Sequence, residues 1–126
     1  MSDLKDKFGE ILVRKLRDEA LDTFNMLAQT DRIEPTCGDL QSKLSKMTDE
    51  QHSVIQETLV MVIDAGIKQF LYTLDYEMTI PGGIEIRVSG KRMVQTEYEL
   101  KVEFESPNGW ISKFGKYDEM GSPKKL

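Results

Sequence analysis

The sequence predicts a single α+β domain in which helices come first and a small antiparallel sheet follows. Up to residue 74, apolar residues recur every three or four positions, which is the period of an amphipathic helix. From residue 76 to residue 105 they recur at every second position, as in a strand with one buried face. Helices and strands segregated in this way are typical of α+β domains. We place the domain at residues 1–117 and expect residues 118–126 to form a flexible C-terminal tail.

Two long helices and one short helix are expected in the first part of the chain. The first long helix runs from about residue 3 to residue 29, where the apolar pattern stops; Pro35 disfavours helix at the residue before it. The stretch GDLQSKLSKM predicts a short helix that Asp39 caps. Thr48 and Gln51 have the spacing of a capping box, so the longest helix is expected to start there.

This longest helix is more apolar than a helix with one buried side. Only Glu57, Asp64 and Lys68 form a polar stripe along it, so we expect other elements to cover it on more than one side. Asp64 and Lys68 stand four residues apart, which favours an exposed ion pair over a catalytic carboxylate. Gly66 lowers the stability of a helix, and we expect a close approach by another segment to explain it.

Three strands of an antiparallel meander are expected after the helices. The runs at 76–80 and 84–88 alternate between apolar and polar residues, and the turn sequence PGG separates them. A second turn, SGKR at 89–92, leads toward the clearest alternation, at 97–105. We expect the helices to pack on the apolar face of this three-stranded sheet and the charged face to meet solvent.

A short helix is expected to close the domain after the turn sequence SPNG. Trp110, Phe114 and Tyr117 stand at i, i+4 and i+7, so one helix would carry all three on a single face, with Asn108 as its cap. Such an aromatic stripe more often belongs to a core than to a recognition surface. We therefore expect Trp110 to be buried.

The composition excludes several classes of function. The 126 residues carry a net charge of −5, which argues against binding nucleic acid because that needs clustered Lys and Arg. The longest apolar run, LVMVI, is far too short to cross a membrane, and the first twenty residues lack the apolar core of a secretory signal. A single cysteine, Cys37, can form no internal disulfide and is expected to be a partly buried filler. These features predict a cytoplasmic protein without membrane contact.

Catalytic and metal-binding patterns are missing from the sequence. The only histidine, His52, has no serine or cysteine nucleophile placed for it by a known motif, and we expect it to be an exposed helix residue. One cysteine and one histidine cannot make a zinc site, and neither a calcium loop nor a phosphate-binding loop is present. We therefore predict a protein that is not an enzyme and has no catalytic residue, cofactor or metal.

The outer face of the expected third strand is the best candidate for a functional surface. It would carry four glutamates and one lysine, namely Glu97, Glu99, Lys101, Glu103 and Glu105. A charged, solvated sheet face is the common explanation of such a pattern, and it also guards an edge against pairing. The functional interpretation is an acidic surface that binds a basic protein partner.

The ending GWISKFGKY, after a glutamate-rich segment, resembles the ending of a family of small bacterial α+β proteins. Some of these are similar to immunity proteins, which neutralise toxins delivered between bacterial cells. The resemblance implies a non-enzymatic binder, acidic because many such toxins are basic nucleases, that occludes the active site of its partner. Two alternatives stay open. One is a structural homo-oligomer, such as a homodimer, built on the wide apolar surface of the longest helix; the other is a protein with a small-ligand pocket between helix and sheet.

Overall fold

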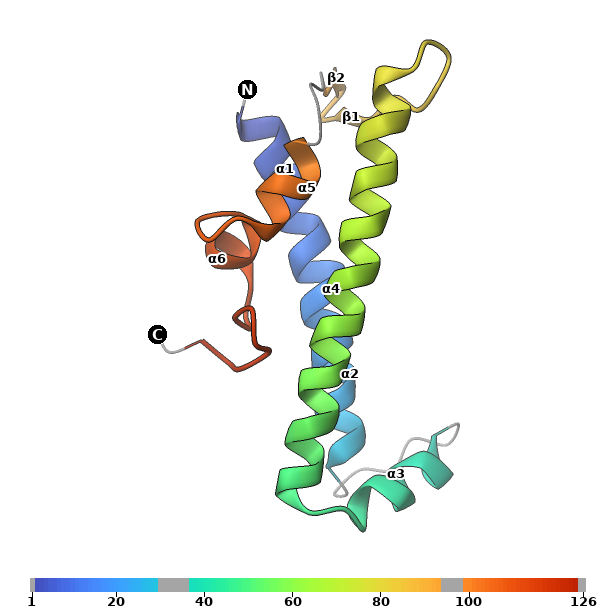
Figure 1. Cartoon of the computed structure of the whole chain (residues 1–126), viewed down its shortest axis with the longest axis vertical. Helices are drawn as coiled ribbons and strands as arrows, with labels where there is room; N and C mark the ends of the chain where they lie inside the picture. The colour runs from blue at the N-terminus through green and yellow to red at the C-terminus, as the bar shows by residue number, and fades with distance from the viewer. Residues whose placement is uncertain (1, 30–36, 94–98, 125–126) are drawn as a thin grey trace.

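The computed structural model describes residues 2–29, 37–93 and 99–124, and helices dominate these segments (Figure 1). The elements are, in order, α1 (Ser2–Leu12), η1 (Val13–Arg17), α2 (Asp18–Ala28), α3 (Gly38–Ser45), α4 (Asp49–Thr79), β1 (Arg87–Val88), β2 (Lys91–Arg92), α5 (Glu99–Glu105) and α6 (Trp110–Phe114). Figure 1 shows α1, η1 and α2 running beside α4, with α5 and α6 on one flank, α3 at one end and the β1–β2 hairpin at the other.

The predicted first helix is confirmed, and it contains one wider turn. Leu12 and Asp18, which flank the π-helical turn η1, both keep right-handed helical dihedral angles, so α1, η1 and α2 follow one another without a break. The predicted short helix is also confirmed as α3, but the predicted cap residue is wrong. Cys37 rather than Asp39 occupies the cap position, and it is half-buried as expected.

The capping box at the start of α4 is confirmed. The Thr48 hydroxyl accepts a hydrogen bond from the Gln51 backbone N–H at 3.1 Å, and the Gln51 side chain accepts one from the Thr48 N–H at 2.9 Å. The helix then continues to Thr79, through the run at 76–80 that we predicted to be a strand. Met78 packs on the core whereas Tyr76, two residues before it, is 55% exposed, which a helix allows and a strand with one buried face would not. Pro81 follows the helix end, as expected of a residue that cannot continue a helix.

The prediction of a three-stranded antiparallel meander is wrong. Within the described residues the sheet is a two-stranded hairpin, in which Arg87 pairs with Arg92 and Val88 with Lys91. Ser89 and Gly90 both have positive φ, which the tight turn between these strands requires. The predicted strand at 84–88 therefore shrinks to its last two residues, and the protein is helix-dominated rather than a helix layer on a sheet.

The run at 97–105, expected to be the clearest strand, contains helix α5 from residue 99 onward. Leu100 and Phe104 are fully buried and stand four residues apart, whereas Val102 between them is 51% exposed. Two-residue alternation over so short a run contains the i, i+4 pair that a helix also uses. The two Asp75 carboxylate oxygens accept hydrogen bonds from the backbone N–H groups of Leu100 and Lys101 at 3.1 and 3.2 Å. A residue of α4 thus caps α5, and the sequence around α5 contains no pattern from which this contact could be predicted.

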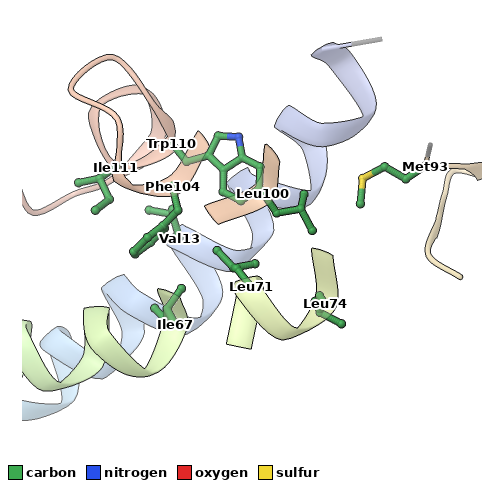
Figure 2. Packing of buried hydrophobic residues seen from close by; sticks show 9 residues of the cluster. All are labelled: Val13, Ile67, Leu71, Leu74, Met93, Leu100, Phe104, Trp110 and Ile111. Atoms are coloured by element: carbon green, nitrogen blue, oxygen red, sulfur yellow. The ribbon is translucent and has the colours of Figure 1, made fainter. Parts of the chain in front are cut away.

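The main core lies where α1, η1, α4, α5 and α6 meet (Figure 2). Trp110 is fully buried at its centre, which confirms the prediction for this residue. Its ring meets Phe8 edge to face at 6.0 Å, and its indole N–H donates to Asp6 at 3.2 Å. A Cβ atom at Gly9 would overlap the Trp110 ring, so this glycine lets α1 approach α6 closely.

Two expectations about the closing segment and one about α4 are wrong. The helix α6 ends at Phe114, so Tyr117 lies beyond it, although Tyr117 is buried in a second, smaller cluster. Gly109 rather than Asn108 stands at the cap position, without a side-chain hydrogen bond. Gly66 is exposed, and a Cβ atom there would meet no atom of the described structure, so close packing within the chain does not explain it.

The segment that follows Tyr117 contacts the helices up to residue 124. Tyr117 and Pro123 form an isolated antiparallel bridge, and the Lys124 ammonium donates to the backbone carbonyls of Ile111 and Ser112. Gly121 has a φ of 83° and lies against Val60 of α4. The domain boundary at residue 117 and the flexible tail at 118–126 stay predictions.

Candidate protein-interaction surface

Helix α5 separates the residues predicted to bind a partner. Glu97 lies outside the described residues, and the other four lie on α5. Glu99 and Glu103 are four residues apart and share one side of the helix; Lys101 and Glu105 share the opposite side, because residues two apart on a helix point nearly opposite ways. The single charged face that a strand would give is therefore not assembled among these four side chains.

Lysines also offset part of this acidic charge. Glu99 forms an ion pair with Lys5 of α1. Glu105 lies 3.5 Å from the Lys101 ammonium and 3.9 Å from that of Lys68 on α4. These pairs tie α5 to its neighbours, and they weaken the case for an acidic surface that attracts a basic partner.

Asp64 is buried and pairs with Arg17, so the predicted exposed pair with Lys68 is wrong. The Asp64 carboxylate accepts hydrogen bonds from the Arg17 Nε at 2.7 Å and Nη2 at 3.2 Å. The same guanidinium donates to the backbone carbonyls of Tyr117 at 2.9 Å and Asp118 at 2.8 Å. Arg17 is fully buried, so the group joins three segments of the chain and offers no open position to a substrate.

The wider turn η1 explains how a charged residue reaches this position. Val13 and Arg17 are both fully buried, four residues apart, at the two ends of η1. A π-helical turn shifts which side chains face inward relative to a regular α-helix. The sequence offered no sign of this turn, and Arg17 appeared there as one more charge between apolar residues.

A second polar cluster holds the segment after α6 against α2. The Asp22 carboxylate accepts hydrogen bonds from the Tyr117 hydroxyl at 2.5 Å and the Lys116 ammonium at 2.9 Å. Asn25 donates to the same hydroxyl at 2.9 Å, and Asp18 accepts from the Lys116 backbone N–H at 2.9 Å. The second carboxylate oxygen of Asp18 is buried without a hydrogen-bond partner in the described structure.

The pKa shifts in this cluster agree with a structural role. Burial raises the pKa of the Asp22 carboxyl, but the hydrogen bonds from Tyr117 and Lys116 outweigh it, so the net pKa lies below its ordinary value. Burial first, and then the hydrogen bond to Asp22, raise the pKa of the Tyr117 hydroxyl. The hydrogen bond to Asp22 is the main cause that raises the pKa of Lys116. These shifts favour a carboxylate, a neutral phenol and an ammonium, a combination that anchors the chain and leaves no nucleophile.

His52 also has a structural position. One of its ring nitrogens lies 2.7 Å from the Leu44 backbone carbonyl, and its ring meets Phe24 edge to face at 6.5 Å. The side chain is half-buried rather than exposed, and it links α4 to α3 and α2. Across the parts of the chain that the structure describes, no three His, Cys, Asp or Glu side chains are grouped to hold a metal ion.

An open groove of about 540 Å³ lies beside α4. Its lining includes Met61, Lys68 and Tyr72 of α4, Lys101 of α5 and Glu119 after α6. The pocket expected between helix and sheet was based on a three-stranded sheet, in place of which the described residues form the two-stranded β1–β2 hairpin. The lining carries charges of both signs, and its members Met61, Ala65, Gln69 and Tyr72 belong to a larger exposed surface of α4.

That larger surface is the most distinctive feature of the molecule, and we name it the α4 outer face. It comprises nine exposed residues of α4, which are Thr58, Met61, Val62, Ala65, Gly66, Gln69, Tyr72, Thr73 and Tyr76. None of them is charged, although 31% of the whole chain is. The charged residues of α4 within this span lie elsewhere, since Asp64 and Asp75 are buried and Lys68 reaches toward Glu105.

The polar groups on the α4 outer face are partly satisfied by the helix itself. The Thr58 hydroxyl donates to the Val54 carbonyl at 2.8 Å, and the Thr73 hydroxyl donates to the Gln69 carbonyl at 3.0 Å. Both threonine hydroxyls thus donate to backbone carbonyls of the helix, which makes the surface more apolar than its sequence suggests. We expected a sheet to cover this helix, and without that sheet the face stays exposed.

Comparison with known proteins identifies no relative. No protein-family model matches the chain, no curated protein matches it, and no solved structure matches its fold. The resemblance of the ending GWISKFGKY to immunity proteins is thus neither supported nor opposed. Among the described residues, no helix combines the length and the apolar character that crossing a membrane requires.

Proposed function

We propose that this chain is a non-enzymatic protein-binding module whose contact surface is the α4 outer face. One observation carries the proposal, which is the uncharged, exposed strip that runs along α4 from Thr58 to Tyr76. At a rise of 1.5 Å per residue this strip is about 27 Å long. Its apolar and aromatic members, Met61, Val62, Ala65, Tyr72 and Tyr76, form an exposed patch interrupted only by uncharged polar residues, and monomeric proteins seldom expose a large patch of this kind without using it for binding.

The residues of the strip suit a protein partner better than a small molecule. Tyr72 and Tyr76 bring large, amphipathic rings, and such residues are enriched at protein interfaces. Ala65 and Gly66 at the middle leave the helix backbone accessible, which allows a second helix to approach closely. The surface is open to solvent rather than enclosed, and its residues Met61, Ala65, Gln69 and Tyr72 also line the groove beside α4, so it fits another helix.

The acidic-surface mechanism is the weaker form of this proposal. Its residues on α5 point to different sides and are partly paired with lysines, so the net charge of −5 is the support that remains for a basic partner. A bacterial toxin as partner rests on the resemblance of the C-terminal ending alone. A cytoplasmic location, in turn, rests on the single cysteine.

A matched pair of substitutions tests the surface. Val62→Glu places a charge on the α4 outer face, and Val102→Glu places the same charge on exposed α5; the two valines are 63% and 51% exposed. Each variant would serve as bait for the tagged chain itself and for proteins of its source organism. We expect Val62→Glu to lose the partners that the parent binds and Val102→Glu to keep them. Equal binding by the parent and Val62→Glu would refute the assignment.

A further inference from the structure

We propose that the partner of the α4 outer face is a second copy of this chain, bound with the two α4 helices antiparallel about a two-fold axis that crosses this face between Ala65 and Gln69, at the level of the buried Ile67. This inference rests on the proposed function, because it names the occupant of the same surface. It is drawn from three properties of the α4 outer face: its spacing, its symmetry and its area.

The spacing is that of a helix–helix seam. Six residues of the α4 outer face recur at alternating intervals of four and three, which are Thr58, Val62, Ala65, Gln69, Tyr72 and Tyr76. This is the heptad interval that keeps one stripe of a helix in contact with a second helix. The other three members, Met61, Gly66 and Thr73, flank the stripe, so the whole face lies on one side of α4.

The seam is symmetric about Ile67 in position and complementary in size. The six residues form three pairs, and the two members of each pair lie equally far from Ile67 on either side of it. The distance is nine residues for Thr58 and Tyr76, five residues for Val62 and Tyr72, and two residues for Ala65 and Gln69. An antiparallel two-fold therefore sets the smaller member of each pair opposite the larger member on the second copy. A parallel arrangement would instead set Tyr72 against Tyr72 and Tyr76 against Tyr76. Large side chains opposite small ones pack without voids or overlap, so the antiparallel arrangement is favoured.

The charges near the axis are compatible with this arrangement. Lys68 flanks the seam close to Ile67, so the two-fold brings both copies of Lys68 near each other. Each ammonium lies 3.9 Å from its own Glu105, which offsets that repulsion. Lys101 and Glu119, which carry opposite charges, line the groove beside the seam.

The area is sufficient for a weak dimer. Tyr72 and Tyr76 are 43% and 55% exposed, which leaves roughly 200 Å² of ring and backbone surface to bury. With Met61, Val62 and the smaller residues, each copy contributes about 450–500 Å², or roughly 900–1,000 Å² for the pair. Interfaces at this lower end of the range are transient, so we expect a dissociation constant in the micromolar range.

Sedimentation of the full-length chain tests whether the dimer exists. The parent is expected to shift from monomer to dimer as its concentration rises through the micromolar range. Val62→Glu is expected to raise the dissociation constant of the dimer by at least about 100-fold. Each copy contributes one glutamate to the seam, and each of these charges would lose its hydration on contact with apolar side chains. Val102→Glu should leave it unchanged. Circular dichroism confirms that both variants are folded.

Disulfide trapping tests the orientation, in a background where Cys37→Ser removes the natural thiol. Thr58→Cys and Tyr76→Cys are made as separate chains and mixed under mild oxidation. In the antiparallel dimer, residue 58 lies opposite residue 76 of the second copy, while equivalent residues are about 27 Å apart. We expect a disulfide between the two different chains and little within either chain alone. Efficient linkage of Thr58→Cys to itself would overturn the antiparallel arrangement.

The outcomes separate this inference from the proposed function. A parent that stays monomeric at high concentration overturns the second copy as partner. The proposed function survives that result if Val62→Glu, but not Val102→Glu, loses a different protein partner. A dimer that both glutamate variants retain overturns the use of the α4 outer face in self-association. A parent that binds neither itself nor another protein overturns both proposals.

Discussion

Replacing Arg17 by methionine tests how the helices and the C-terminal segment are held together. The guanidinium is fully buried, and it donates hydrogen bonds to Asp64 and to the carbonyls of Tyr117 and Asp118. Its removal leaves a buried carboxylate without its cation, which costs about 3–5 kcal/mol. The two carbonyls lose a donor, at about 1 kcal/mol each or more. Packing by the methionine offsets part of this, so we expect a loss of about 4–6 kcal/mol.

A double variant separates the charge from the other contacts. Arg17→Met with Asp64→Leu removes both ions together, so no uncompensated charge stays buried. The expected loss falls to about 1–3 kcal/mol, which is the cost of the two carbonyls, because exchanging a buried ion pair for apolar residues is often neutral. The two single changes and the double change form a cycle whose coupling energy measures the ion pair.

Urea unfolding followed by circular dichroism supplies the free energies for all four proteins. A loss near 5 kcal/mol would take up much of the stability of a domain of this size, so the single variants are best measured with a stabilising osmolyte. The reasoning would be refuted if Arg17→Met lowered the free energy of unfolding by less than about 1 kcal/mol, since a buried carboxylate that loses its cation destabilises a protein by more than that. It would also be refuted if the double variant lost as much as the two single variants together.

Three further predictions concern the core, the α5 cap and pH. Trp110→Ala should cost about 3–5 kcal/mol in urea unfolding because it empties the centre of the core; a variant as stable as the parent would contradict its burial. Asp75→Ala should cost about 1–2 kcal/mol by removing the cap of α5, with faster hydrogen exchange at Leu100; unchanged exchange there would exclude the cap. The folded pKa of Asp22 is lowered, so its contribution to stability is present above the ordinary value of 3.8 and is lost as pH falls through the folded pKa. Acid titration of Asp22→Asn should show a shallower loss of stability than the parent, and parallel curves would contradict this. The raised pKa values of Lys116 and Tyr117 act oppositely, since their contribution is full below pH 10 and is lost as pH rises through the folded values.

The sequence was sufficient for the helices whose signals are local. The capping box of Thr48 and Gln51 located the start of α4, and the three- and four-residue spacing located the first long helix and α3. The burial of Trp110 was predicted correctly, although Tyr117, which we placed on the same helical face, lies beyond α6. These features depend on neighbours within about seven residues, which periodicity can detect.

The sheet was mispredicted because alternation over a short run is ambiguous. Leu100, Val102 and Phe104 fit a strand, yet the two that are buried also stand one helical turn apart. The contact that decided the outcome is the carboxylate of Asp75 at the start of α5, some 25 residues away in sequence. A tertiary cap of this kind leaves no local pattern, and it overrides a weak strand preference.

The buried pair of Arg17 and Asp64 was missed for a related reason. Asp64 was assigned to the polar stripe of the longest helix. Arg17 was not expected to be buried, because a regular helix was assumed throughout the first long helix. The π-helical turn η1 alters which side chains of the helix face the interior, and Arg17 is one of those that become buried. The α4 outer face was not predicted. From the sequence we recognised only that the longest helix is more apolar than one buried side requires, and we expected a sheet to cover the additional side.

Sedimentation of the parent beside Val62→Glu and Val102→Glu tests the central claim most directly. The account predicts that the parent dimerises at micromolar concentration, that Val62→Glu stays monomeric, and that Val102→Glu behaves as the parent. The two valines are similarly exposed on different helices, so general effects of an added charge cancel in the comparison. If all three proteins sediment alike, as monomers or as dimers, the α4 outer face is not where this chain meets itself.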